Sequence, residues 1–83
     1  MSKSKPISYK NINKYTEMGL NISYYRKKKG LTQEQLAEKI GISRSHLSAI
    51  EAPNIVKSFS IELLFDIANA LDIEVYKLLV FRD

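Results

Sequence analysis

Apolar residues recur along the chain at the spacing of helices that each bury one face. The first stripe occupies positions i, i+4 and i+7 and consists of Met18, Ile22 and Tyr25, which predicts a helix over about residues 15–29. Gly30 follows three consecutive lysines. A glycine after a basic last turn is typical of a helix C-terminus, because glycine adopts the left-handed cap conformation cheaply and the cations face the negative end of the helix dipole.

Two short helices are predicted next, and each begins with the same local signals. Thr32 can cap a helix over residues 32–40, because Gln35 completes a T-x-x-Q capping box. Ser43 can cap a helix over residues 43–51, which the following Ala-Pro dipeptide ends because the residue before a proline avoids helical angles. Apolar residues flank both caps and form two candidate hydrophobic staples: Leu31 with Leu36, and Ile42 with Leu47.

A fourth helix and a short fifth helix complete the pattern. The fourth is predicted over residues 59–71, where the apolar residues at helical spacing are Ile61, Leu64, Phe65, Ala68 and Leu71. The fifth is predicted over residues 74–80, with Val75, Leu78 and Leu79 directed inward. Five helices joined by short connections predict a compact all-α domain over residues 15–83. The polar, lysine-rich residues 1–14 are expected to form a flexible basic arm.

The second and third predicted helices are separated only by a Gly41-Ile42-Ser43 turn, which is the geometry of a helix-turn-helix. The glycine allows the chain to reverse tightly. The outer face of the third helix carries polar or short side chains, namely Arg44, Ser45, Ser48 and Ala49. Such a face suits the major groove of DNA, although the same pattern also fits a helical hairpin with a solvated outer face.

The net charge of +4 is distributed unevenly. Residues 1–30 carry eight Lys/Arg and one acid, a net charge of +7, whereas residues 31–83 carry five bases and eight acids, a net charge of −3. One basic part and one mildly acidic part indicate that a particular surface faces a polyanion. A solvated basic tail would give the same totals, so charge alone does not decide between the two interpretations.

The composition argues against several other classes of protein. The chain has no cysteine and a single histidine, His46, so neither a disulfide nor a thiolate metal site is expected. No acid–base pair, glycine-rich phosphate loop or metal cluster appears, and we therefore expect no enzyme activity, no cofactor and no small-molecule ligand. No apolar run reaches the roughly 20 residues of a membrane helix, and the N-terminus lacks a secretory signal. A cytoplasmic protein is expected.

Three stretches of the sequence, taken in order, resemble the lambda-repressor/Cro-like helix-turn-helix domains of the Xre family. They are Ile22-x-x-Tyr25-Arg26-x-x-x-Gly30-Leu31-Thr32-Gln33-Glu34-x-Leu36-Ala37, then Gly41-Ile42-Ser43-Arg44-Ser45-x-Leu47-Ser48-x-Ile50-Glu51, then Ser60-Ile61-Glu62-x-Leu64-x-x-Ile67-Ala68-x-Ala70-Leu71. The resemblance covers about residues 18–79 and implies a lambda-repressor-like domain that binds double-stranded DNA, most simply as a repressor.

The resemblance implies a role for each matching position. Arg44 and Ser45 match base-reading positions, and Arg44 can donate two hydrogen bonds to guanine. Ser48 and Ala49 match a second row of base contacts, in which the Ala49 methyl can meet a thymine methyl. Contacts with backbone phosphates are implied for Gln33, Ser43, His46, Lys57 and Ser58. For His46, partial packing is an alternative to the phosphate contact.

Arg26 and Glu51 match a family pair that forms a structural salt bridge between the first and third helices. The planar guanidinium suits this role because it can hold a carboxylate with two bonds. The chain departs from the family pattern after Glu51, where Ala52-Pro53 replaces the usual Asn-Gly or similar pair, so the backbone is expected to leave the third helix differently. Asp72 stands where a glycine is common, and Asp tolerates turn conformations.

Apolar residues outside the predicted core stripe favour a homodimer, at least on DNA. Leu63, Val80 and Phe81 are the candidates for this interface. In the alternative arrangement, Phe81 folds back onto the first helix near Leu20 and Tyr24 and closes the core of the monomer. The competing function is a protein-interaction module with the same fold, such as an antitoxin or the partner of a regulator.

Overall fold

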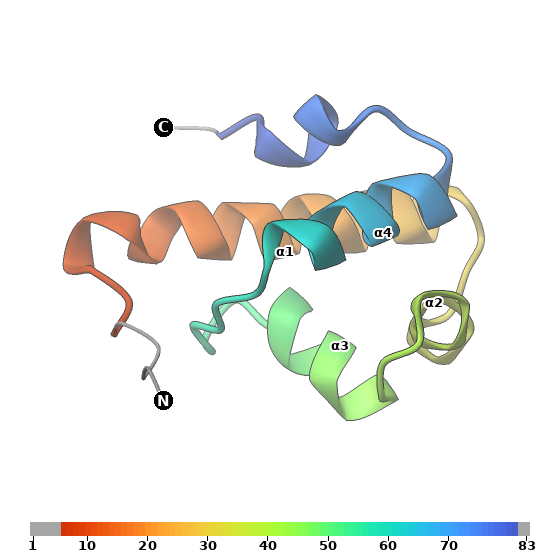
Figure 1. Cartoon of the computed structure of the whole chain (residues 1–83), viewed down its shortest axis with the longest axis horizontal. Coiled ribbons are helices and arrows are strands. Elements are labelled where there is room, and N and C mark those ends of the chain that lie inside the picture. Colours follow the sequence, from red (N-terminus) through yellow and green to blue (C-terminus); the bar gives the residue numbers. More distant parts are fainter. Residues whose placement is uncertain (1–5, 82–83) are drawn as a thin grey trace.

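The computed structural model describes residues 6–81 (Figure 1). Four α-helices are present in this range: α1 (Ile12–Lys28), α2 (Gln33–Ile40), α3 (Arg44–Glu51) and α4 (Ile61–Leu71). Two 3-10 helices, η1 (Tyr9–Asn11) and η2 (Val75–Leu79), flank them. The described residues contain no strand, which confirms the predicted all-α class. In Figure 1, α1 runs across the middle of the molecule, with η2 on one side and α2 and α3 on the other.

Two predicted elements differ from the structure. The expected fifth helix is the 3-10 helix η2, so four α-helices are observed where five were predicted. The N-cap residue of η2, Glu74, makes no side-chain capping bond. The five residues of η2 are attached to the rest of the domain by Leu78, whose side chain is buried in the core. Both helix types place residues i and i+3 on nearly the same side, so the short apolar pattern did not distinguish them.

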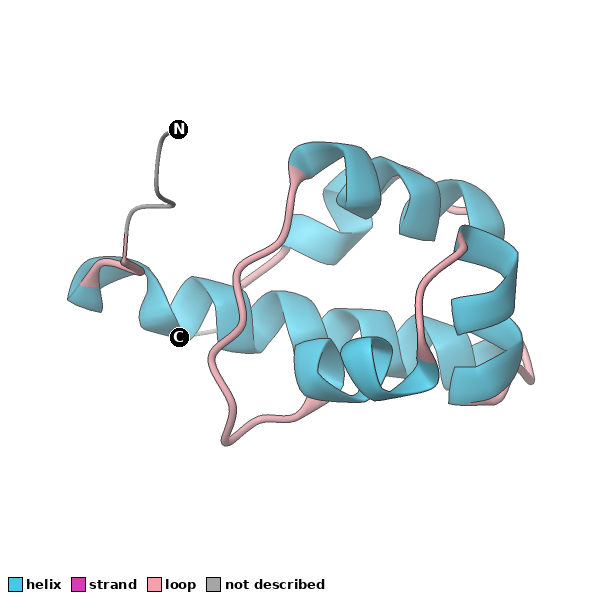
Figure 2. Cartoon of the chain, turned by 60° about the horizontal axis from the view of Figure 1, so that its bottom comes forward, coloured by secondary structure: helices cyan, strands magenta, loops and turns pink. Residues whose placement is uncertain are grey.

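The first α-helix also begins earlier than predicted. It starts at Ile12 and follows η1, so residues 9–14 of the expected arm are helical, while residues 1–5 lie outside the described residues. The Ser8 hydroxyl caps η1 by accepting from the Lys10 amide, and the ring of Tyr15, further along α1, lies edge-on to that of Phe59 with centroids 5.8 Å apart. Figure 2 shows the N-terminal turns of α1 projecting beyond the other helices.

The predicted caps of α2 and α3 are confirmed. Thr32 Oγ1 accepts a hydrogen bond from the Gln35 amide (3.0 Å), and Gln35 Oε1 accepts one from the Thr32 amide (2.8 Å), which completes the capping box. Ser43 caps α3 by accepting from the His46 amide (3.0 Å). Asp72 ends α4 with a φ of +55°, in the left-handed region that Asp tolerates better than most residues.

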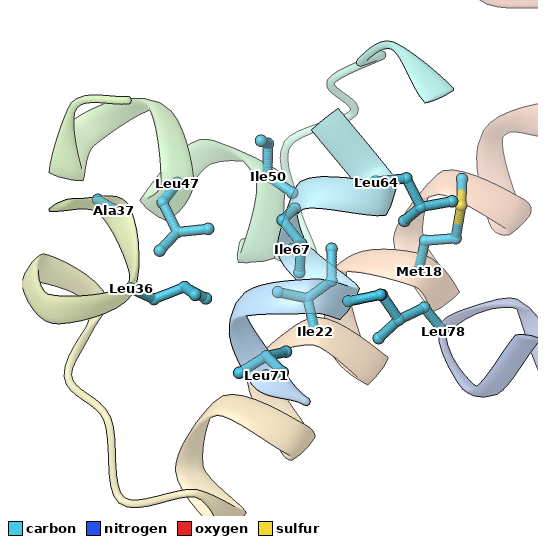
Figure 3. Close-up of a cluster of buried hydrophobic side chains, with 11 residues drawn as sticks. Met18, Ile22, Leu36, Ala37, Leu47, Ile50, Leu64, Ile67, Leu71 and Leu78 are labelled. Carbon is cyan, nitrogen blue, oxygen red and sulfur yellow. The ribbon is translucent and has the colours of Figure 1, made fainter. Parts of the chain in front are cut away.

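The core lies between all four α-helices and η2 (Figure 3). Its buried side chains are Met18, Ile22, Leu36, Ala37, Leu47, Ile50, Leu64, Ile67, Ala68, Leu71 and Leu78. Six of them are almost completely buried and come from every α-helix and from η2, so each element depends on the others for its burial. The core therefore fixes where α2 and α3 sit on the rest of the domain.

Gly19 permits a backbone contact between α1 and α3. A Cβ atom at this position would overlap the carbonyl oxygen of Ile50 and would lie 3.4 Å from Cα of Glu51. Any side chain would therefore force the two helices apart at the C-terminal end of α3. The apolar spacing did not single out this glycine, because its partner lies far away in the sequence.

We expect the Gly19→Ala substitution to lower the free energy of unfolding by about 1–3 kcal/mol, the usual cost of overpacking. In an unconstrained helix interior the same change would raise stability by up to about 1 kcal/mol, so the sign is diagnostic. Urea unfolding measures the effect, and Asn13→Ala on the exposed side of α1 is the control. A Gly19→Ala protein as stable as the wild type would contradict the close contact.

Candidate nucleic-acid interface

The turn between α2 and α3 is built as the sequence predicted. Gly41 has a φ of +76°, and the amide of Ile42 donates to the carbonyl of Ala37 (3.1 Å). Leu36 and Ala37 of α2 and Leu47 and Ile50 of α3 are buried. Because both helices bury their inner faces in one core, the turn leaves the opposite face of α3 outside.

The four predicted base-contact residues share that outer face. Arg44 and Ser45 are exposed in the first turn of α3, and Ser48 and Ala49 follow one turn later and are half-buried. The hydroxyl oxygens of Ser43 and Ser45 are 3.2 Å apart. Arg44 forms no ion pair with any residue between 6 and 81, so its guanidinium is available to an external acceptor.

A buried ion pair lies behind this face. Arg26 Nε donates to Glu51 Oε2 (2.8 Å), and Arg26 Nη2 donates to Glu51 Oε1 (3.0 Å). Both side chains are more than nine-tenths buried. Arg26 Nη1 also donates to the carbonyl of Leu31 (2.7 Å), so one guanidinium joins α1, the turn before α2 and the end of α3. The predicted structural salt bridge is present.

Gln33 is drawn into the same network. Its Nε2 donates to Glu51 Oε1 at 3.0 Å, and the residue is half-buried at the start of α2. This contact uses one of the two amide N–H groups, and the structure therefore adds an internal partner that the sequence did not reveal.

The other predicted phosphate contacts surround α3. The Ser43 hydroxyl is the N-cap acceptor of α3, and His46 is half-buried in its first turn. Lys57 and Ser58 are both exposed in the connection between α3 and α4. The structure thus brings Gln33, Ser43 and His46 to the helix-turn-helix, whereas Lys57 and Ser58 lie on a separate loop.

The predicted dimer residues occupy different environments. Leu63 is partly buried and packs against the core, whereas Val80 and Phe81 are 54% and 39% exposed. The buried amide of Asn21 donates to the carbonyls of Leu78 (3.1 Å) and Val80 (2.9 Å), which ties the C-terminal segment to α1. Sequence reasoning missed Asn21, because its partners lie 57 and 59 residues further along the chain.

Two other classes of site are not found among residues 6–81. None of the described helices is long and apolar enough to cross a membrane. Between residues 6 and 81, no group of three or more His, Cys, Asp or Glu side chains is placed to hold a metal ion.

Comparison with known proteins identifies similar domains. The model of the helix-turn-helix family matches residues 22–78. The HTH-type transcriptional regulator SinR of Bacillus licheniformis is 41% identical over 66 residues, which cover 80% of this chain and 59% of SinR. The chain therefore spans less than two thirds of the length of this curated relative.

Two solved structures share the fold. The crystal structure of the biofilm regulator SinR in complex with DNA has 41% sequence identity and a TM-score of 0.69, and the match covers 76% of this chain and 98% of that one. The restriction-modification controller protein C.AhdI from Aeromonas hydrophila has 30% identity and a TM-score of 0.76, covering 84% and 99% respectively.

We expect removal of either partner of the Arg26–Glu51 pair to destabilise the fold by about 3–5 kcal/mol, because the remaining charge stays buried without its counter-ion. The measurement is a double-mutant cycle with Arg26→Met and Glu51→Met in urea. Glu38→Ala, at an exposed position of α2, should change stability by less than about 0.5 kcal/mol. A coupling energy near zero would show that the two side chains contribute independently.

Proposed function

Because the chain belongs to the helix-turn-helix family, we propose that it regulates transcription by binding duplex DNA with α3 in the major groove. The observation that carries this proposal is the outer face of α3. It combines an exposed guanidinium that has no ion-pair partner among the described residues with short side chains that let the helix approach base edges. We propose that the protein acts as a repressor, in the compartment that holds the DNA.

Base recognition is assigned to four residues of α3. Arg44 reaches the edge of a guanine, where O6 and N7 accept two hydrogen bonds. Ser45 and Ser48 donate to or accept from neighbouring bases, and the Ala49 methyl meets a thymine methyl. Arg44 can adapt to the groove because it lies at the exposed N-terminal turn of α3.

Phosphate contacts position the domain. Gln33 has a second amide N–H to donate, and the unpaired backbone amides at the start of α2 favour an anion. Ser43 and His46 contact the phosphate beside α3, and the exposed Lys57 and Ser58 contact the next phosphates along the backbone. Residues 1–14 add non-specific attraction to the polyanion through their lysines.

We expect Arg44→Ala to weaken binding to the preferred duplex by about 1–3 kcal/mol and to relax the preference at one base pair. Selection from random duplexes gives the preferred site, and titration of that site and of a scrambled duplex gives the two affinities. Lys39→Ala, an equally charge-reducing change at the exposed far end of α2, is the control. Equal losses on both duplexes would remove Arg44 from base recognition.

We also propose that the protein binds its site as a two-fold dimer. Apolar side chains remain exposed at the N-terminal part of α4 and along the C-terminal segment: Ile61, Phe65, Leu79, Val80 and Phe81. Leu63 contributes less to this surface than the sequence predicted, because it packs against the core. A dimer would present two α3 helices about 34 Å apart and would require a near-palindromic site.

Sedimentation of the protein with a 20-base-pair site tests the dimer. We expect two chains per duplex at saturation, and we expect Val80→Lys to abolish the cooperativity between them without altering the fold, because only the backbone carbonyl of Val80 is engaged by Asn21. Lys77→Ala, in the same segment, serves as the control. One chain per duplex, together with a non-palindromic footprint, would exclude the dimer.

A further inference from the structure

A groove beside the proposed DNA contacts has no assigned occupant. It lies between α1 and the C-terminal end of α3 and has a volume of about 340 Å³. Its lining includes Leu20, Ser23, Lys27, Gln33, Ser48 and Pro53. Gln33 and Ser48 are proposed DNA contacts, so the groove borders the surface that is proposed to face the duplex.

The charges around the groove favour an anion. Arg26 and Glu51 also line it, but they neutralise each other through two hydrogen bonds. Lys27 is the remaining charged residue of the lining, so the groove has a net positive charge. Lys27 is also exposed and can reach an external anion. Ser23 lies one helical turn before Lys27, on the same side of α1, and adds a hydroxyl donor.

Apart from Gln33 and Ser48, the remaining lining is apolar. Leu20 is 38% exposed on the same side of α1, and Pro53, in the segment after α3, lines the same groove. Proline has no backbone N–H, so at this position the chain offers a phosphate no amide and instead presents a hydrocarbon ring. A surface that is cationic at one part and apolar at another matches a nucleotide backbone, in which charged phosphates alternate with deoxyribose.

We propose that this groove is a sugar–phosphate subsite, in which Lys27 and Ser23 bind one backbone phosphate next to Gln33, and the adjoining deoxyribose lies against Leu20 and Pro53. The inference rests on the proposed DNA binding and extends it to α1. It also assigns a function to the Ala52-Pro53 departure, because a phosphate contact that a loop amide cannot make is supplied by the side chain of Lys27.

The test compares two lysine variants that change the net charge equally. Lys27→Gln removes the groove cation. Lys28→Gln removes a cation whose ammonium lies 5.8 Å from the centroid of the Tyr24 ring, outside the groove lining. For Lys27→Gln we expect weaker binding to every duplex and a salt slope reduced by about one, since a phosphate contact carries no sequence information. For Lys28→Gln we expect the slope of the wild type. Thermal melting confirms that both variants are folded.

Two further measurements locate the contact. A neutral methylphosphonate placed at successive backbone positions should weaken wild-type binding at the phosphate held by Lys27, and that position should lose its effect in Lys27→Gln. Leu20→Ala should weaken binding while leaving the salt slope unchanged. Equal salt slopes for the two lysine variants would overturn the groove assignment alone, whereas a wild-type protein that binds no duplex would overturn the DNA-binding function together with it.

Discussion

The buried pair of Arg26 and Glu51 constrains the half of the domain that is proposed to face DNA. Each charge satisfies its hydrogen-bonding groups only when α1, the turn before α2 and the end of α3 are in one arrangement, because the guanidinium binds both Glu51 and the Leu31 carbonyl. Desolvation offsets much of the attraction between two buried charges. We therefore infer that the pair contributes to the uniqueness of this arrangement more than to net stability.

The contact at Gly19 reinforces the same constraint by a different physical means. Gly19 and Arg26 are seven residues apart and lie on one side of α1, separated by about 10 Å along the helix axis. Both meet the C-terminal end of α3, one through backbone van der Waals contact and the other through hydrogen bonds. The buried side chains of Leu47 and Ile50 hold the rest of α3 on the core, while its N-terminal turn, with Arg44 and Ser45, remains exposed.

The features that could be predicted from the sequence are those whose causes lie within a few residues. The caps at Thr32 and Ser43 are examples, because each cap and its partner amide are three residues apart. Gly19 and Asn21 could not be identified in this way, because their partners are distant in the sequence. Gly19 contacts the backbone of Ile50, and Asn21 donates to the carbonyls of Leu78 and Val80, which are 57 and 59 residues away. The roles of the residues proposed to contact DNA came from family resemblance. The resemblance implied that Gln33 contacts a phosphate, but it did not indicate the hydrogen bond from Gln33 to Glu51.

That bond to Glu51 links the fold to recognition. A glutamine on a helix surface ordinarily samples several rotamers, and holding one of them for a phosphate costs conformational entropy. In this domain the carboxylate that pairs with Arg26 also accepts from Gln33 Nε2, so much of that cost is met when the chain folds. The second N–H of Gln33 is then oriented before DNA arrives, and preorganisation of this kind raises affinity without any additional contact. The same carboxylate thus sets the position of α3 and the orientation of a side chain proposed to bind the DNA backbone.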